Sequence, residues 1–298
     1  MYRGLFFILG MRYRLSADTR HLLAYAAHTA RNFYRNYIWY RGYIAYHGYI
    51  SVISGYIFND RKVIMKFILA SQNAHKAEEF ASAVSTATIV PAPGAVEVDE
   101  NADSFIGNAR LKARAYAERF KTNAIADDSG LCVDYLSGAP GIHSARYGRL
   151  EPDADMDPDK TAANNRKLLK NLAGVPEADR GAHFTCALCL VIVDPADIAS
   201  IKARMPKLDS GIYSVAFFDS EGREISAESD DVARAEVAFE AYAAGRILEA
   251  AHGHGGFGYD PLFYCPEAGC TFADLTQLQK LSVSHRGRAI GLLRNLLA

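Results

Sequence analysis

The sequence has few of the residues that mark secreted or zinc-binding proteins. Its 298 residues include 5 cysteines and 1 tryptophan. Five scattered cysteines are too few to form a disulfide framework in a chain of this length. The single C-x-x-C pair, Cys186 and Cys189, lies in an apolar run and has no second pair at zinc-site spacing. We therefore interpret the cysteines as free thiols of a protein in a reducing, cytoplasmic compartment.

Acidic residues are nearly absent from the first 64 positions, which carry nine Lys/Arg against two Asp/Glu. Three interpretations of this segment compete. Residues 37–58 are long enough to span a membrane but contain Arg41 and His47. Residues 11–35 resemble a targeting presequence, and the whole segment could instead be an upstream extension that does not fold. We favour the third and predict an extension at 1–64 and a folded domain at 65–298, for which no membrane contact is expected.

Basic residues are the minority in the rest of the chain, where 24 Lys/Arg face 32 Asp/Glu. Nucleic-acid binding needs a basic surface that neutralises phosphates, so this body is not expected to bind nucleic acid. Anionic substrates would have to be met by a few placed cations or by a metal ion. The sequence also lacks a G-x-x-x-x-G-K-[ST] motif, which excludes a P-loop nucleotidase.

The hydrophobic pattern predicts alternating strands and helices. Strands are expected at 66–70, 131–135, 183–193, 211–219, 232–238 and 246–250, and helices at 73–84, 104–120, 158–172 and 284–297. An irregular excursion is expected at 195–210, an acidic loop at 97–101, and turn-rich loops at 138–147 and 253–261. This order of elements is typical of an α/β fold.

The stretch 125–131 carries the strongest chemical signal. An apolar run that reads as a buried strand reaches Asp127, Asp128, Ser129 and Gly130. We predict that the strand ends here in a turn, with the two carboxylates pointing to opposite sides. Strand ends in α/β sheets are where ligands gather, so one carboxylate could hold a metal or a water.

Other polar groups along the chain suit a phosphorylated ligand. Ser71, Asn73 and Lys76 surround a predicted helix start, where free N–H groups and a cation would hold an anion. Four glycines at 253–258 allow the backbone to approach a ligand closely. Carboxylates that bind Mg²⁺, together with cations and N–H groups, are what phosphoryl chemistry requires. Taken singly, however, an acidic loop or a capped helix is more often an ordinary solvated element.

Six motifs, in order, resemble one known family, the non-canonical purine nucleoside triphosphate pyrophosphatases, also called inosine/xanthosine triphosphate diphosphatases. The resemblance covers the chain from Met65 to its C-terminus. The matching segments are Ser71-x-Asn73-x-x-Lys76, residues 104–109 with Lys112, residues 126–131, residues 138–147, residues 256–261 and residues 284–287.

The resemblance implies a fold and an activity. The fold would be a long, curved mixed β-sheet flanked by helices, with two lobes and a central substrate cleft. The reaction would be Mg²⁺-dependent hydrolysis of ITP, dITP or XTP to the monophosphate and pyrophosphate. The resemblance also implies a homodimer.

It further implies roles for individual residues. Asp128 would be the general base and a Mg²⁺ ligand, joined by Asp99 or Glu100. The phosphates would be held by Ser71, Asn73 and Lys76. The remaining substrate contacts would come from Ser129, Phe257, Gly258, Tyr259, Asp260, Lys280, His285 and Arg286.

Two other functions stay open at this point. A related pyrophosphatase could act on modified pyrimidine nucleotides, although the segment from Ser284 to Arg286 favours a purine. A nucleotide-binding module could hold the ligand without cleaving it, but the retained Asp127, Asp128 and Lys76 argue against a dead site.

Overall fold

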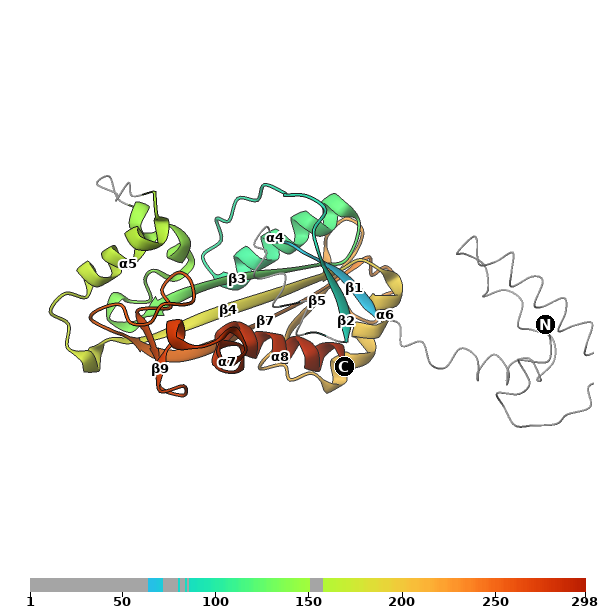
Figure 1. The fold of residues 1–298 in the computed structure, drawn as a ribbon. Helices are drawn as coiled ribbons and strands as arrows, with labels where there is room; N and C mark the ends of the chain where they lie inside the picture. The colour runs from blue at the N-terminus through green and yellow to red at the C-terminus, as the bar shows by residue number, and fades with distance from the viewer. Residues whose placement is uncertain (1–63, 72–79, 81–83, 85, 151–157) are drawn as a thin grey trace, which may run out of the picture. The chain divides into compact units, whose positions relative to one another are not determined.

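Three long antiparallel strands form the centre of the fold (Figure 1). The computed structural model describes residues 64–71, 80, 84, 86–150 and 158–298. The long strands are β3 (Ala124–Val133), β4 (Gly181–Ile192) and β7 (Arg234–Ile247). Shorter strands extend the same sheet: β1 (Met65–Leu69), β2 (Ala87–Pro91), β5 (Ser214–Phe218), β6 (Glu224–Ile225), β8 (Phe263–Cys265) and β9 (Cys270–Thr271).

The sheet is mixed and open. Within the described residues its order is β2-β1-β3-β4-β7-β5-β6, and β8 pairs with both β7 and β9. The pairings of β1 with β2 and with β3 are parallel, whereas all the other pairings are antiparallel. The expected α/β class and the mixed sheet flanked by helices are therefore confirmed.

Helices cover both faces of the sheet. In Figure 1, α4 lies over one face, and α7 and α8 lie over the other. The described α-helices are α4 (Phe105–Phe120), α5 (Lys160–Asn171), α6 (Pro195–Arg204), α7 (Gln277–Val283) and α8 (His285–Leu297). The 3₁₀ turns are η1 (Asp134–Leu136), η2 (Gly141–Arg149), η3 (Glu177–Asp179), η4 (Met205–Lys207) and η5 (Phe272–Asp274).

The alternation of side chains along β4 builds a core on each face. Leu188 and Leu190 join a cluster with residues of α6 and α8, whereas Ala187 and Cys189 join a cluster with residues of α4. Cys186 points to the α8 side, so the two cysteines of the C-x-x-C pair lie on opposite faces. All five cysteines are free thiols, as the sequence predicted.

A third core cluster lies farther along the same strands. It includes Leu131 of β3, Phe184 of β4 and Phe263 of β8. On β3, Ile125 belongs to the α8-side cluster and Leu131 to this third cluster, and between them come Asp127 and Ser129. Polar side chains therefore separate two apolar regions along one face of the sheet.

The predicted turn at Asp127–Gly130 is wrong, because β3 runs through it without a break. Asp127 pairs with Leu188 and Gly130 pairs with Thr185 in a regular antiparallel register. Glycine is required at position 130 because the neighbouring chain leaves no room for a side chain. A Cβ atom at Gly130 would lie 2.5 Å from the carbonyl oxygen of Gly141.

Two other sequence predictions are also wrong. The excursion expected at 195–210 contains helix α6, which Asp194 caps through its side chain and Pro195 begins. The two short strands expected at 232–238 and 246–250 are one strand, β7, which pairs with β4 from Ala235 to Arg246. The tertiary pairing partner decides this length, and the sequence alone does not show it.

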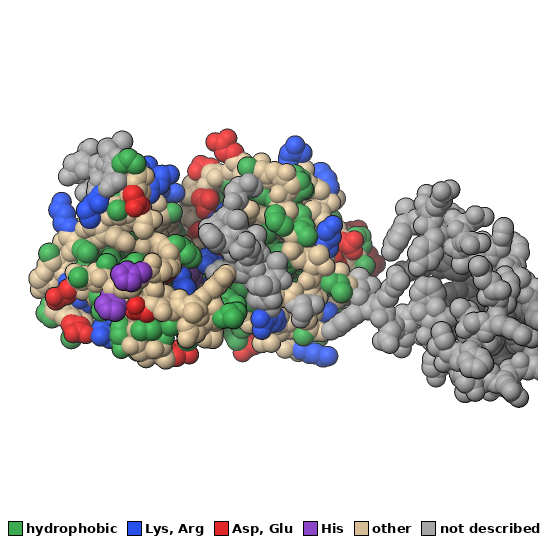
Figure 2. Space-filling model, viewed as in Figure 1, with side chains coloured by type: hydrophobic (Ala, Val, Ile, Leu, Met, Phe, Trp, Pro, Cys, Tyr) green, Lys and Arg blue, Asp and Glu red, His purple; other side chains and the backbone are tan. Residues whose placement is uncertain are grey.

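Charged side chains of both signs are interspersed on the face of the molecule seen in Figure 2. No described helix is both long and apolar enough to cross a bilayer. The interpretations of residues 1–63 and nearly all of the helix predicted at 73–84 lie outside the described residues.

Candidate active site

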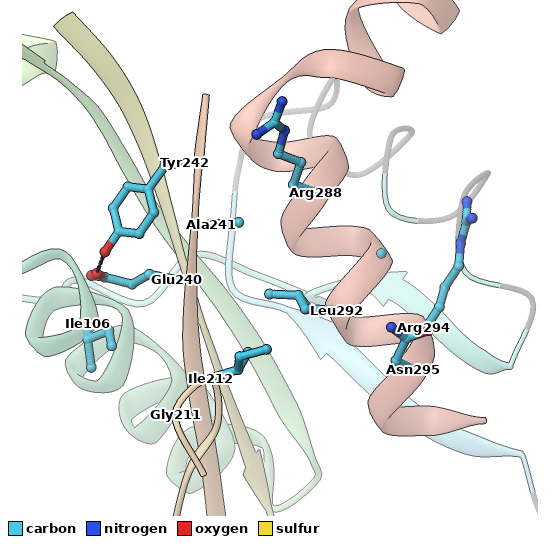
Figure 3. A pocket seen from close by; sticks show the side chains of 11 residues that line it. Ile106, Gly211, Ile212, Glu240, Ala241, Tyr242, Arg288, Leu292, Arg294 and Asn295 are labelled. Atoms are coloured by element: carbon cyan, nitrogen blue, oxygen red, sulfur yellow. Dashed lines mark hydrogen bonds between the residues drawn. The ribbon is translucent and has the colours of Figure 1, made fainter. Parts of the chain in front are cut away.

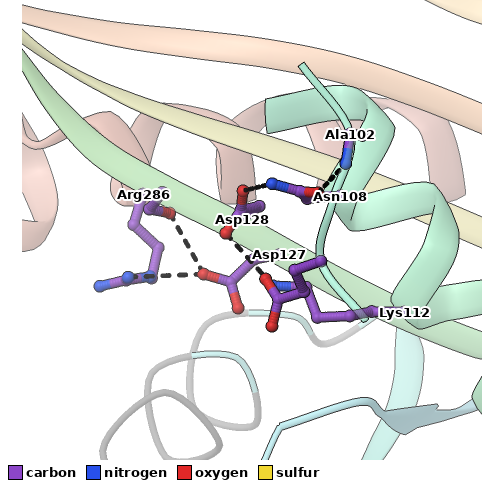
Figure 4. Close-up of polar contacts among 8 residues, drawn as sticks. Ala102, Asn108, Lys112, Asp127, Asp128 and Arg286 are labelled. Atoms are coloured by element: carbon purple, nitrogen blue, oxygen red, sulfur yellow. Dashed lines mark hydrogen bonds and ion pairs between the residues drawn. The ribbon is translucent and has the colours of Figure 1, made fainter. Parts of the chain in front are cut away.

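Asp128 lies on the face of β3 that α4 covers (Figure 4). Asn108 and Lys112 stand one turn apart on α4, so their side chains point the same way. The Asn108 Nδ2 atom donates to Asp128 Oδ2 at 3.2 Å, and Lys112 Nζ donates to Asp128 Oδ1 at 3.2 Å. Ser104 caps the helix, and Asn108 Oδ1 accepts from the Ala102 N–H at 3.0 Å. Each carboxylate oxygen of Asp128 thus receives a donor from α4.

A second carboxylate reaches the same lysine. Lys112 Nζ lies 2.9 Å from Glu100 Oε2. Asp99, its neighbour, is exposed and accepts instead from Asn101 Nδ2 at 3.0 Å. The structure therefore brings Glu100 and Asp128 together around one cation and leaves Asp99 on the surface.

Burial and charge shift the pKa values of this group. Burial raises the pKa of Asp128, and the positive charge of Lys112 and the hydrogen bond from Asn108 only partly offset that effect. The negative charge of Glu100 raises it further. Burial lowers the pKa of Lys112, but the charges of Asp128, Asp127 and Glu100 outweigh burial, so its pKa is raised overall.

The two carboxylates fit a magnesium ion. Mg²⁺ in nucleotide enzymes commonly takes one or two protein carboxylates and completes its shell with phosphate oxygens and water. Glu100 and Asp128 already converge on a positive group, the Lys112 ammonium. No group of three or more metal-binding side chains occurs among the described residues. A site built on these two carboxylates would therefore leave coordination positions for a substrate.

Asp127 faces the other side of the sheet, as predicted for adjacent strand residues. Arg286 Nη2 lies 3.5 Å from Asp127 Oδ2, and Ser129 Oγ donates to the same oxygen at 3.2 Å. Asp127 and Arg286 are buried, with relative side-chain exposures of 1% and 5%. A buried carboxylate with these partners holds the start of α8 against β3 (Figure 4).

The start of α8 presents His285 and Arg286. Ser284 caps the helix by accepting from the Gly287 N–H at 3.2 Å. The His285 ring stacks on Phe184 with 4.8 Å between centroids and 12° between planes. Gly287 lets the start of α8 lie close to α7, because a Cβ there would collide with the carbonyl of Leu281.

The glycine-rich loop forms a tight turn at 256–260. Buried Asp260 accepts from the Phe257 N–H at 2.8 Å and from Lys280 Nζ at 2.5 Å. Lys280 also lies 4.2 Å from the centroid of the Phe257 ring, which is half exposed. Gly256 and Gly258 have positive φ angles of 74° and 62°. The turn therefore brings together an exposed aromatic ring, a carboxylate and a lysine.

The expected phosphate-binding residues are only partly visible. Ser71 is the second residue after β1, and Ala70 between them donates through its N–H to the Ile125 carbonyl at 2.8 Å. Because β1 and β3 are parallel, Ser71 leaves the sheet beside the Asp127–Asp128 region. Asn73 and Lys76 lie outside the described residues.

Sequence reasoning missed the partners of Asp128 as site residues. Asn108 and Lys112 lie in one of the segments that resemble the family, but no role was predicted for them. Their spacing of four residues on the predicted helix 104–120 was the available signal. Helix α7, which carries Lys280, was not predicted either. Its Thr276–Gln279 capping box was the missed signal.

Comparisons with known proteins give matches that agree with one another. A model of the Ham1 family matches residues 67–206 and 224–296. A dITP/XTP pyrophosphatase of Pseudomonas aeruginosa is 39% identical over 234 residues, which are 77% of this chain and 95% of that relative. A dITP/XTP pyrophosphatase of Treponema denticola is 39% identical over 230 residues, which are 76% of this chain and 95% of that relative.

Solved structures match as well. The Staphylococcus aureus Ham1 protein has a TM-score of 0.56 at 30% identity, covering 78% of this chain and 97% of that one. A nucleoside-triphosphatase, dITP/XTP pyrophosphatase, from Mycobacterium abscessus has a TM-score of 0.51 at 33% identity, covering 77% of this chain and 98% of that one. Family model, relatives and structures agree, and the chain belongs to the Ham1 family.

Proposed function

We propose that this chain is a Mg²⁺-dependent pyrophosphatase that hydrolyses dITP, ITP and XTP to the monophosphate and pyrophosphate. The observation that carries the proposal is the partly buried Asp128 carboxylate, which is held by Lys112 and Asn108 and paired across Lys112 with Glu100. The names of the curated relatives, dITP/XTP pyrophosphatases, support the choice of substrate.

In the proposed reaction, water attacks the α-phosphorus of the nucleotide. A P–O bond to the water oxygen forms, the bond between the α-phosphorus and the bridging oxygen breaks, and pyrophosphate leaves. Asp128 accepts the proton of the attacking water. In the chain without bound metal, burial raises the pKa of this carboxyl, which favours that role. Mg²⁺ held by Glu100 and Asp128 would neutralise charge on the phosphate oxygens.

Lys112 also has a role in the proposed reaction. Its ammonium lies between the two carboxylates, and its raised pKa keeps it charged at neutral pH. A fixed cation beside the reacting phosphate stabilises the negative charge that grows in the transition state. Ser71, Asn73 and Lys76 would hold the remaining phosphates.

The base would bind on the opposite side of β3. Phe257 offers a ring for stacking, while His285, Arg286 and Lys280 offer donors for a 6-keto oxygen. The 6-amino group of ATP would leave such donors unpaired, a mismatch that can discriminate strongly. Ser129, Gly258, Tyr259 and Asp260 would complete this side of the site.

The test is pyrophosphate release from ITP, dITP, XTP, GTP and ATP by the full chain, with Mg²⁺ and with EDTA. Selective, Mg²⁺-dependent cleavage of the first three would support the proposal. Cleavage restricted to modified pyrimidine nucleotides would replace the purine substrate class, and tight ITP binding without cleavage would indicate a binding module.

We also propose that the enzyme is a homodimer whose partner covers the open edge of β7. Strand β5 pairs with β7 only as far as Ala238, and β8 pairs with it from Arg246 onward. No other described strand pairs with residues 239–245 along that edge. Tyr242 and Ile212 are exposed there, and a groove beside them reaches Leu292 of α8 (Figure 3). An open edge next to exposed apolar side chains is suited to pairing with another chain.

Light scattering tests this arrangement. Tyr242→Lys should lower the dimer fraction, because a charged side chain on the edge opposes pairing. Tyr135→Lys is the matched control, since Tyr135 is similarly exposed but lies on η1. Equal dimer fractions for both variants would rule out this edge as the interface.

The free thiols support our proposal of a cytoplasmic location.

A further inference from the structure

The turn at 256–260 is held from two directions. On one side, Lys280 of α7 binds Asp260. On the other side, the Tyr259 hydroxyl donates to the Ser144 carbonyl at 2.9 Å, and the Asn165 Nδ2 atom of α5 donates to the Gly258 carbonyl at 3.1 Å. The second set of contacts ties the turn to η2 and α5, which supply no expected substrate contact.

Ser144 connects that second set to the strand that carries Asp128. Its hydroxyl oxygen accepts from the Leu131 N–H at 2.9 Å and donates to the Gly141 carbonyl at 2.6 Å. Leu131 is three residues beyond Asp128 on β3. Hydrogen bonds therefore run from the catalytic strand through Ser144 to Tyr259, in the turn expected to bind the base.

Two adjacent asparagines on α5 make different contacts. Asn164 is satisfied within the α5–η2 packing: its Oδ1 accepts from the Gly148 N–H at 2.7 Å, and its Nδ2 donates to the Ser144 carbonyl at 3.1 Å. The amide of Asn165 reaches Gly258 instead, and its buried Oδ1 has no hydrogen-bond partner among the described residues. A buried acceptor without a partner disfavours folding, and such features concentrate where function requires them.

We infer that Asn165 is a positioning residue that sets the placement of the base-binding turn and thereby the preference for 6-keto purines. Its donor fixes the carbonyl of Gly258, a residue that has a positive φ of 62° and no side chain to restrain it. Asp260 follows closely after this residue and binds Lys280, so a rotation there displaces the lysine that is expected to face the 6-keto oxygen. No described hydrogen bond or ion pair joins Asn165 to Asp128, Lys112 or Glu100. This inference rests on the proposed function of the turn.

The test uses two variants that remove the side-chain donor of Asn165, one of nearly the same shape and one smaller. Asn165→Asp puts a carboxylate oxygen opposite the Gly258 carbonyl, and Asn165→Ala removes the group without adding charge. For both variants of the full chain we expect KM for ITP to rise about tenfold with kcat within about twofold, because the chemical step is untouched. The kcat/KM for ATP should stay unchanged, since ATP does not make the 6-keto contacts, so the ITP preference should fall about tenfold.

The matched control for Asn165→Ala is Asn171→Ala on the same helix. Asn171 donates to the Tyr147 hydroxyl at 2.8 Å, a side-chain hydrogen bond that is not made to the turn. Asn171→Ala should leave KM for ITP unchanged while lowering the melting temperature about as much as Asn165→Ala does. Equal KM changes in both helix variants, or a loss of kcat without a change in KM, would reduce Asn165 to a structural residue.

Binding of IMP separates this inference from the proposed function. If the wild-type chain failed to hydrolyse ITP, the proposed reaction would be wrong. Isothermal titration with IMP would still compare Asn165→Asp with the wild type. An affinity about tenfold weaker for the variant supports the positioning role, and equal affinity, or no IMP binding by either protein, overturns it.

Discussion

The two faces of strand β3 carry adjacent carboxylates in different surroundings. Asp128 faces α4 and receives donors from Asn108 and Lys112, with Glu100 beside them. Asp127 faces α8 and contacts Ser129 and buried Arg286. The first carboxylate is surrounded by groups that tune its charge, whereas the second is tied to the helix that presents His285. The proposed phosphate chemistry and the proposed base recognition thus depend on two adjacent residues of one strand, Asp128 and Asp127, which face opposite sides of the sheet.

The largest expected difference between the faces is in kcat. Asp128→Asn should lower kcat by about a thousandfold or more, because the amide cannot accept the proton of the attacking water. Asp127→Asn should lower kcat far less and should reduce stability, because buried Arg286 loses a carboxylate partner. Steady-state kinetics with ITP and thermal denaturation check both variants. Equal losses of kcat would show that the two faces do not divide the work in this way.

The next effect concerns the metal and compares two neighbouring carboxylates. Glu100→Gln should raise the Mg²⁺ concentration needed for half-maximal activity by about ten- to a hundredfold, because it removes one of two converging carboxylates. Asp99→Asn should leave that concentration unchanged, since Asp99 is exposed and bonded to Asn101. Mg²⁺ titrations of activity give the comparison. A larger effect at Asp99 would mean that the acidic loop rearranges when the ion binds.

Local sequence patterns predicted many of the elements on both faces. The strand at β1, the helix α4 and the final helix α8 were predicted from the spacing of hydrophobic residues. The opposite directions of Asp127 and Asp128 follow from the two-residue period of a strand. These are properties of neighbouring residues, which the sequence displays directly.

Contacts between distant segments could not be predicted in the same way. The Asp127–Gly130 stretch has the composition of a turn, but pairing with β4 keeps it extended. The break expected in β7 disappears for the same reason. The choice of Glu100 over Asp99 depends on where Lys112 lies when α4 packs on the sheet. Each of these features depends on how separate segments pack together, and not on the residues next to it in the sequence.

The smallest predicted effect is a change in the titration of Asp128 without Mg²⁺. Lys112→Met should raise the pKa of Asp128 further, because it removes the positive charge that opposes burial. Glu100→Gln should lower the pKa, because it removes a negative charge. Asn108→Leu should raise the pKa of Asp128, because a hydrogen bond to the charged form is lost.

Carbon-13 NMR of labelled aspartate, with the Asp128 signal assigned from Asp128→Asn, measures these pKa shifts. Asp99→Asn is the control expected to produce none. Shifts of the same sign for Lys112→Met and Glu100→Gln would show that burial alone, and not the balance of charges on the α4 face, sets the basicity of Asp128.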